Sequence, residues 1–468
     1  MFERFFEGID AANVRSLSKE HTGGRRSIKL RNKNGGNFTV KTLNYGSSGA
    51  ETEMLQLGLS RSGFYKGKTD GKFGIGTLNA VRRFQTSQGL RPDGIAGEKT
   101  FRALRPYLTG YFTAVIRPGD TFYGLAEKYN TTVKAIETAN PGLSAENLPV
   151  GAKIVIPYGF ELIPTDIHYT SELFELLSEG LKARYPFIGS GVFGNSVLKR
   201  PLYAFRIGNG KKQLFINAAH HANEWITTPL VMKFLEKYLE AYSSGGEIYG
   251  LDARELFEKT TLFAAPLVNP DGMDLVNGAL NENTDYYRKV KCIAAAYPAV
   301  PFPDGWKANI AGTDLNLNYP AGWEQAKQIK YSKGWVSPAP RDYVGTEPLC
   351  APEAKAVFDF TLKHDFYMTV SYHTQGEVIY WKYKDTEPPK GQRIGLALAK
   401  ASGYTLEEPE YESGNAGYKD WFILKYDRPG YTVEAGKGSN PLPLSQFDMM
   451  FNDNIGIMAS ALKETAEL

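Results

Sequence analysis

Three side chains that can bind a metal ion follow apolar segments of the chain. His221 and Glu224 lie three residues apart shortly after the apolar segment KQLFINAA, so both can face one ion on a turn just past a buried strand. Zinc in hydrolases takes three nitrogen or oxygen ligands and leaves one position for water. Of the six histidines, His373 also ends an apolar segment, FYMTVSYH. His373 is therefore the best candidate for the third ligand.

The segments that must position these side chains alternate between apolar, strand-like stretches and longer helical patterns. After Pro157, stretches such as TTLFAAPLVN and PGYTVEAG alternate with helical patterns such as TTPLVMKFLEKYLEAY. The alternation predicts an α/β domain that runs to the C-terminus, with a mixed, mostly parallel sheet flanked by helices. In such sheets, sites lie beyond the carboxyl ends of the strands. This context matters because a His-x-x-Glu spacing alone is common in ordinary helices and turns.

Length and composition limit the remaining possibilities. A chain of 468 residues favours two or more domains, and 42% hydrophobic with 22% charged residues is typical of a folded protein. The net charge of +3 gives no strong basic field and so argues against nucleic-acid binding. No apolar stretch approaches the roughly 20 residues of a membrane span. Residues 1–43 lack the pattern of a secretory signal and are expected to form a flexible leader.

Residues 44–109, the first module, are predicted to be a small all-α domain. Apolar residues at helical spacing are interrupted by turn signals at Asp70-Gly71 and Asp93-Gly94, which indicates three short helices. The segment resembles the peptidoglycan-binding domain family at positions that include Leu55, Gly63, Phe73-Gly74, Phe84-Gln85, Gly97 and Thr100. The resemblance implies binding to the bacterial cell wall. These positions also specify the small fold, so none by itself establishes ligand binding.

Residues 110–159, the second module, are predicted to be a small α+β domain. A short strand, a helix start at Gly119-Asp120-Thr121 and a closing KIVIP strand bracket two helical patterns. The segment resembles the LysM domain, which binds glycans that contain N-acetylglucosamine. The matching positions are Gly119-Asp120-Thr121, Asn140-Pro141, Leu148, Gly151 and Ile156-Pro157.

Residues 160–468, the third domain, resemble the zinc metallocarboxypeptidase family called M14. The family's motifs occur in order as His221-x-x-Glu224-Trp225, Asn269-Pro270-Asp271-Gly272, Asp314-x-Asn316-x-Asn318, His373 and Glu434. Such an ordered set is far more specific than any one motif. The resemblance implies an α/β carboxypeptidase-like fold in which His221, Glu224 and His373 bind one zinc ion per chain.

The same resemblance implies roles for three further residues. Asp314 would orient His221 by accepting its second ring N–H. Glu434 would act as the general base, taking a proton from water and delivering it to the leaving amine. Arg288, in Tyr287-Arg288-Lys289, would stabilise the developing oxyanion. The alternatives are a loop-capping aspartate, a glutamate in a buried ion pair and a surface arginine, respectively.

The sequence departs from the family where a substrate's C-terminal carboxylate is bound. The Asp-x-Asn-Arg-Asn run normally supplies an arginine that pairs with this carboxylate, but that position is Leu317, although Asn316 is retained. Lys419 occupies the position that selects the substrate side chain and is expected to contact an acidic partner; the alternative is a solvated lysine. The family's mobile tyrosine falls near Tyr411, with a register displaced by one residue.

These departures resemble the bacterial γ-D-glutamyl-L-diamino acid endopeptidases, which cut the γ-D-glutamyl to diaminopimelate bond of wall peptides. The expected partners are therefore the glycan and stem peptides of peptidoglycan, and two tethered wall-binding modules would raise the local substrate concentration. Three alternatives remain: a zinc carboxypeptidase on ordinary peptide C-termini, a zinc amidase or deacylase, and an inactive wall-binding protein.

Location and cysteine chemistry follow less directly from the sequence. The modules suggest a cell-wall, spore or sporulating-cell location, while the sequence leaves the export route and oligomeric state open. Cys292 and Cys350 are the two cysteines; they could pair with each other or remain as two buried free thiols.

Overall fold

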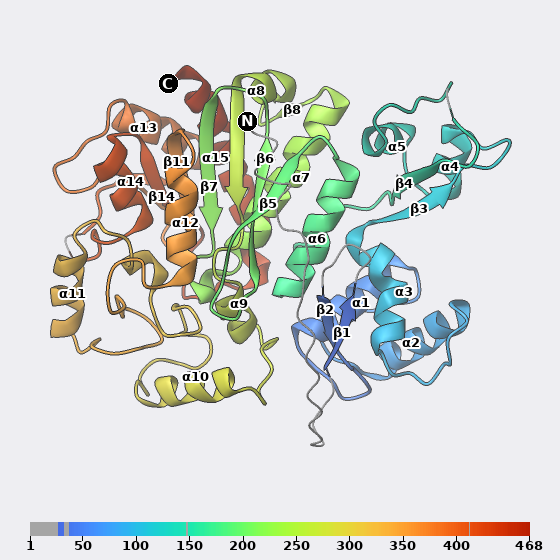
Figure 1. Ribbon diagram of the computed structural model, residues 1–468, viewed down its shortest axis with the longest axis horizontal. Coiled ribbons are helices and arrows are strands. Elements are labelled where there is room, and N and C mark those ends of the chain that lie inside the picture. Colours follow the sequence, from blue (N-terminus) through green and yellow to red (C-terminus); the bar gives the residue numbers. More distant parts are fainter. Residues whose placement is uncertain (1–26, 32–36, 147, 411) are drawn as a thin grey trace, which may run out of the picture.

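A computed structural model describes residues 27–31, 37–146, 148–410 and 412–468, with two small modules beside one large α/β domain (Figure 1). No helix in these ranges is long and apolar enough to cross a membrane. Within the expected flexible leader, β1 (Ser27–Arg31) and β2 (Asn37–Lys41) form an antiparallel hairpin. The sequences of both strands, SIKLR and NFTVK, have the alternating pattern that favours strands.

The first module contains the three predicted helices, α1 (Ala50–Arg61), α2 (Ile75–Ser87) and α3 (Glu98–Thr109). Two buried glutamines hold its two Asp-Gly turns in the same way. The Gln56 side chain accepts from Gly71 N and donates to Asp70 Oδ1, and Gln85 does the same with Gly94 N and Asp93 Oδ1. Both turn glycines have positive φ, 68° and 78°, a conformation that glycine adopts without strain. The module is thus a repeated helix-and-turn unit.

The second module has the predicted order of strand, helix, helix and strand: β3 (Tyr111–Val115), α4 (Phe122–Lys128), α5 (Val133–Ala139) and β4 (Lys153–Pro157). Thr121 and Thr132 cap the two helices by accepting from backbone N–H groups. Asn140 exchanges two hydrogen bonds with the backbone of Val155 on β4, at 2.7 and 2.8 Å. The module packs around a hydrophobic core of its own.

The described part of the third domain is built on an eight-stranded mixed sheet with the order β13-β12-β14-β11-β7-β10-β6-β5. The central strands β14, β11, β7 and β10 are parallel, and antiparallel pairs flank them. The predicted mixed sheet is confirmed. The strands are β5 (Gly189–Asn195), β6 (Pro201–Ile207), β7 (Lys212–Ala218), β10 (Thr260–Ala265), β11 (Phe366–His373), β12 (Val378–Tyr380), β13 (Thr405–Glu407) and β14 (Gly430–Glu434); β8 (Glu247–Ile248) and β9 (Leu251–Asp252) form a separate hairpin.

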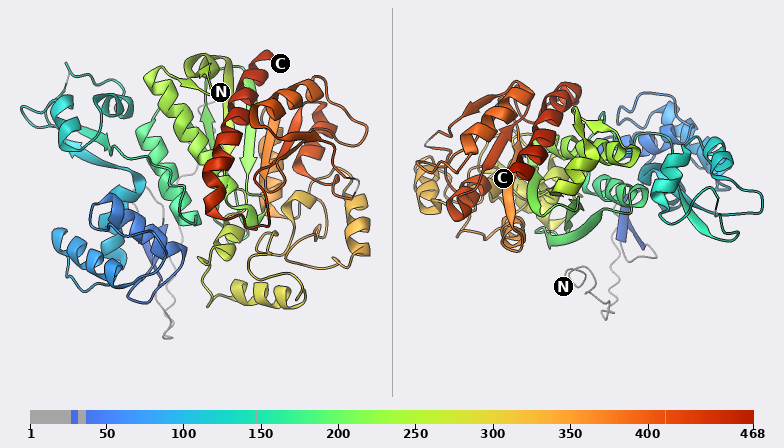
Figure 2. Two further views of the ribbon diagram at one scale, coloured as in Figure 1. Left: turned by 180° about the vertical axis from the view of Figure 1, so that it is seen from behind. Right: turned by 90° about the horizontal axis from the view of Figure 1, so that it is seen from above.

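Helices cover both faces of this sheet (Figures 1 and 2). One face carries α7 (Thr227–Ser244), α13 (Gly391–Ser402) and α15 (Phe447–Glu467), and the other carries α12 (Pro352–Leu362) and α14 (Tyr418–Tyr426). Neighbouring residues of β7 point to opposite cores, since Leu214 and Ile216 pack on the first face and Phe215 on the second. The other helices are α6 (Ser171–Arg184), α8 (Ala253–Lys259), α9 (Pro270–Val276), α10 (Asp285–Ala295) and α11 (Trp323–Ser332), with short 3-10 turns η2 (Ala222–Glu224), η3 (Leu315–Leu317) and η4 (Leu444–Gln446).

The first module is docked against the third domain through polar contacts and a shared apolar core. The Arg61 guanidinium donates to the backbone carbonyl groups of Leu162 and Glu161, at 2.7 and 2.9 Å. Glu53 of α1 accepts from the backbone and the ring of His168. The apolar residues of this module also belong to the same continuous core as those of the third domain. The first module is therefore fixed against the third domain.

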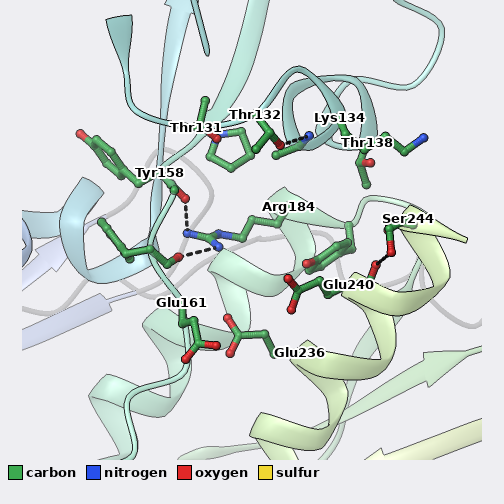
Figure 3. Close-up of a pocket in the computed structure, with 16 residues that line it drawn as sticks. Thr131, Thr132, Lys134, Thr138, Tyr158, Glu161, Arg184, Glu236, Glu240 and Ser244 are labelled. Atoms are coloured by element: carbon green, nitrogen blue, oxygen red, sulfur yellow. Dashed lines mark hydrogen bonds between the residues drawn. The ribbon is translucent and has the colours of Figure 1, made fainter. Parts of the chain in front are cut away.

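The second module meets the third domain across a cavity of about 320 Å³. Arg184 of α6 donates to the backbone carbonyl groups of Gly110, Tyr158 and Phe160 at 2.9–3.1 Å. Figure 3 shows Arg184 reaching toward Tyr158, with Glu236 and Glu240 on the neighbouring wall. Because the guanidinium is used to join the two domains, this cavity is a seam between them. Both modules therefore have a set orientation relative to the third domain.

Candidate active site

The three predicted metal ligands meet where two neighbouring parallel strands end. The chain leaves β7 at Ala218 and passes through His221 into η2, which ends at Glu224, and His373 is the last residue of β11. All three side chains are buried, and their potential ligand atoms lie within 4.8 Å of one another. Among the described residues, this is the one group of His, Cys, Asp or Glu side chains arranged to hold a metal ion.

The spacing of the ligand atoms fits zinc. His221 Nδ1 lies 2.9 Å from Glu224 Oε1 and 3.1 Å from His373 Nδ1, and His373 Nδ1 lies 3.0 Å from Glu224 Oε2. Nitrogen and oxygen ligands of a tetrahedral zinc ion are about 3.4 Å apart. Only small shifts of the side chains separate the observed spacings from those of a tetrahedral zinc site. Two imidazoles with one carboxylate are also a donor set found in catalytic zinc sites.

Asp314 fixes the orientation of the His221 ring. His221 Nε2 lies 3.1 Å from Asp314 Oδ1, which leaves Nδ1 directed at Glu224 and His373. The second oxygen of Asp314 accepts from the backbone N–H of Asp342 at 3.1 Å. Although burial opposes ionisation, the charge and hydrogen bond of His221 hold the pKa of Asp314 well below its usual range. The aspartate also caps η3, so the capping alternative and the orienting contact coexist.

Glu434 ends β14 directly beside His373, with which it pairs in the parallel register. Its side chain lines the cavity next to the metal ligands. Burial raises the pKa of Glu434 to about 8, and the Glu224 carboxylate acts in the same direction while Lys307 and His221 oppose it. A carboxyl group in this position, beside the metal ligands, is placed to accept a proton and return it.

Lys307 is a cation of the site that the sequence did not reveal. Its Nζ lies 3.1 Å from Glu224 Oε1. Its backbone N–H donates to the carbonyl of Pro340, and its carbonyl accepts from the backbone N–H of Ala222, the residue after the ligand His221. These bonds hold the backbone of Lys307 beside the metal ligands. A usable signal was present, because Trp306 precedes Lys307 as a tryptophan precedes the arginine in the family's Trp-Arg-Lys pattern.

The structure does not bring Arg288 to this site, which corrects the sequence-based expectation. Arg288 lies on α10, is exposed and forms an ion pair with Asp285 one turn earlier. The buried face of α10 is formed by Val290 and Ala294. Arg288 lies off that face, so its side chain projects into solvent. Arg288 is therefore a surface arginine, the alternative that the sequence had left open.

A cavity of about 250 Å³ opens beside His221 and continues away from the metal ligands. Asn316 lines it, and its Oδ1 accepts from Tyr418 N at 3.1 Å. Leu317 also lines it and packs against Trp323, Ala326, Val344 and Ala416. The residue at the position of the family's carboxylate-binding arginine is therefore apolar.

Lys419 lines the same cavity but is already engaged. Its Nζ lies 2.6 Å from Asp420 Oδ1 and donates to the carbonyl of Lys382 at 2.7 Å, and the residue is only 5% exposed. This differs from the expectation of a lysine that presents its charge to an acidic substrate group, and it also excludes a solvated lysine. Tyr411 lies outside the described residues. Cys292 and Cys350 are free and exposed, neither paired nor buried.

Comparison with known sequences identifies the class of the third domain. The sequence model of the zinc carboxypeptidase family, Peptidase_M14, matches residues 175–454, more than half of the chain. The chain belongs to this family, and its cofactor is zinc. The first module matches the peptidoglycan binding domain over residues 48–104, and the second matches the LysM domain over residues 114–157.

Two relatives match more than half of this chain. Gamma-D-glutamyl-L-diamino acid endopeptidase 1 of Lysinibacillus sphaericus is 44% identical over 282 residues, which cover 60% of this chain and 69% of that protein. The uncharacterized protein YqgT of Bacillus subtilis (strain 168) is 37% identical over 283 residues, 59% of this chain and 73% of that protein. The spore cortex-lytic enzyme of Bacillus cereus is 38% identical over 125 residues, 27% of this chain and 46% of that protein. These likenesses fit an association with cell wall or spore.

Proposed function

We propose that this protein is a zinc-dependent endopeptidase that hydrolyses the γ-D-glutamyl to diaminopimelate bond of peptidoglycan stem peptides. The observation that carries the proposal is Leu317. An apolar side chain stands where the family's carboxypeptidases bind a C-terminal carboxylate, while the site keeps the three metal ligands, Glu434 and the cation Lys307. The 44% identity to a γ-D-glutamyl-L-diamino acid endopeptidase supports the same bond.

The proposed zinc ligands are His221 Nδ1, Glu224 and His373 Nδ1, with Asp314 holding His221 in the required orientation. Zinc bound there would polarise the scissile carbonyl and lower the pKa of the attacking water. All three ligands come from the ends of rigid strands or the turn that follows one, so the protein pre-positions them.

Proton transfer is assigned to Glu434 and charge stabilisation to Lys307. Glu434 takes a proton from the water that attacks the carbonyl carbon, and returns it to the diaminopimelate nitrogen as the amide bond breaks. Lys307 takes the role that the sequence suggested for Arg288, because it is the cation beside the metal ligands. Its ammonium group would donate to the carbonyl oxygen as negative charge develops there.

The two modules suit a polymeric wall substrate. Their families support binding to cell-wall polymer, and we further propose that the protein acts in the wall or in a spore or sporulating-cell compartment. Because both modules are fixed against the third domain, they would hold the bound wall strand in a set orientation to the active site. This adds a geometric constraint to the higher local concentration that binding modules provide.

Defined muropeptides, incubated with and without a chelator and analysed by mass spectrometry, test the proposal. The expected products carry a free amine on diaminopimelate and a free γ-carboxylate on D-glutamate, and the chelator should prevent their formation. Release of a C-terminal amino acid from ordinary peptides would instead support a carboxypeptidase, and loss of an acyl group an amidase or deacylase. A protein that gives no products with zinc present would be an inactive wall-binding protein.

A further inference from the structure

Four cationic side chains line the active-site cavity within the described part of the chain: Lys307, Lys330, Arg341 and Lys419. Each of the three lysines forms an ion pair through its only charged group, and Lys307 is also the group proposed to stabilise the developing oxyanion. Lys307 Nζ lies 3.1 Å from Glu224, Lys330 Nζ 2.5 Å from Asp342, and Lys419 Nζ 2.6 Å from Asp420. Their side chains are 20%, 14% and 6% exposed, whereas that of Arg341 is 43% exposed.

Arg341 is held by one edge only. Its Nε lies 2.7 Å from Asp342 Oδ2, and the terminal nitrogens have no hydrogen-bond partner among the described residues. The other oxygen of Asp342 is occupied by Lys330. A guanidinium presents its donors in a planar fork that matches a carboxylate, so the remaining edge of Arg341 is a complete binding surface for one.

The backbone around Arg341 is fixed to the metal-binding end of the site. The carbonyl of Pro340 accepts from the backbone N–H groups of Lys307 and Ala308, at 2.8 and 2.9 Å. On the other side, Asp342 N donates to Asp314 Oδ2 at 3.1 Å. Asp342 has a positive φ of 64°, a strained conformation for a residue other than glycine, which persists only where the surroundings enforce it. Arg341 is thus held at a set place relative to the zinc ligands.

We propose that the Arg341 guanidinium binds a carboxylate that flanks the scissile bond of the wall peptide, which makes it a specificity-determining residue. The inference rests on the proposed function. A γ-D-glutamyl bond uses the side-chain carboxyl of glutamate, so the α-carboxylate remains free beside the bond, and diaminopimelate carries carboxylates on the other side. A substrate of this kind needs a cation in the cavity, and with Leu317 at the family's arginine position Arg341 is the one that remains available.

The test compares the zinc-loaded parent protein with zinc-loaded Arg341→Gln in assays on three peptides. One peptide carries all its carboxylates, a second has the D-glutamyl α-carboxylate amidated, and a third has the diaminopimelate carboxylate amidated. We expect Arg341→Gln to lower kcat/KM on the acidic peptide by about 10- to 100-fold, mainly through KM, and to match the parent on the peptide that lacks the contacted group. Arg341→Lys should recover part of the loss.

Arg288→Gln is the matched control, because Arg288 is an exposed arginine outside the cavity. Arg341→Gln should fold as the parent does, since Asp342 keeps its contact with Lys330; an unchanged melting temperature checks this. An effect within about twofold on the acidic peptide, or an equal loss on all three peptides, overturns the assignment.

A binding measurement separates this inference from the proposed function. In a Glu434→Gln background, titration calorimetry with the intact acidic peptide measures affinity without cleavage. If the parent cleaves no γ-D-glutamyl peptide, the proposed function fails, and the binding experiment still decides on Arg341. An affinity that falls about 10- to 100-fold with Arg341→Gln supports the contact, and an unchanged affinity rejects it.

Discussion

The chemical groups and the substrate-binding cations of the active-site cavity are positioned in different ways. At the metal end, His221, His373 and Glu434 stand on or just after the ends of parallel strands, in the buried centre of the sheet. Of the cations that line the cavity, Arg341 lies in a loop and Lys419 in the first turn of a helix. The strand ends place groups for chemistry that the whole family shares, whereas the loops carry the charges that can vary with substrate. The predictions below separate these two contributions.

The largest effect is expected from His373→Ala. Removing one of three ligands leaves two donors, too few for an open hydrolytic zinc site. The variant should purify without zinc and show no peptidase activity. Elemental analysis of protein prepared without chelator measures occupancy, with His364→Ala, a histidine outside the site, as the control. Full zinc occupancy in His373→Ala would show that the ligand set is wrong.

Glu434→Gln should retain zinc and lose catalysis. The amide has nearly the shape of the carboxyl group but cannot accept the proton of water, so kcat is expected to fall by about 10²- to 10⁴-fold. Zinc content and peptide affinity should remain those of the parent. A variant that keeps more than a tenth of the parental kcat would mean that another group accepts the proton.

Lys307→Met tests the cation that the structure places beside the metal ligands. Loss of a donor to the developing oxyanion typically lowers the rate by about 10²- to 10³-fold. Arg288→Met is the paired variant and should be as active as the parent, because Arg288 projects into solvent. Steady-state kinetics on one peptide decides between the two residues. The opposite ranking would restore the assignment made from the sequence.

The sequence predicted the fold and the metal end well, for a physical reason. Ligands that follow buried strands come after apolar segments, so the pattern made His221 and His373 candidates, and the resemblance to the M14 family then specified the ligand set. Arg288 and Lys307 show the limit of prediction from sequence patterns. Each is a cation near an aromatic residue, and only the packing of α10 shows that Arg288 faces solvent. Arg341 carries no sequence signal, since its position depends on hydrogen bonds from distant segments.

The two modules show the same limit of prediction from sequence. Their helices and strands follow from local patterns and turn signals, as with Gln56 and the Asp70-Gly71 turn. Their docking does not, because Arg61 and Arg184 act on backbone carbonyl groups of other domains. Backbone acceptors leave no trace in sequence. The fixed arrangement of the modules therefore appears only in the structure.

The smallest effect on catalysis is expected from Lys419→Met. Lys419 and Asp420 form a buried pair, with side chains 6% and 4% exposed, and Asp420 also accepts from Gly417 N at the start of α14. Removing the ammonium leaves a buried carboxylate without its counter-charge, which typically costs about 3–5 kcal/mol of stability. The variant should therefore melt at a lower temperature than the parent, while its preference for acidic over amidated peptides stays unchanged.

Lys382→Met is the matched control, because its partners Glu387 and Glu408 are about 60% exposed and exposed pairs contribute about 0–1 kcal/mol. If Lys419→Met instead keeps the parental melting temperature and loses the preference for acidic peptides, Lys419 binds the substrate carboxylate. Substrate recognition would then use the helix rather than the loop that carries Arg341.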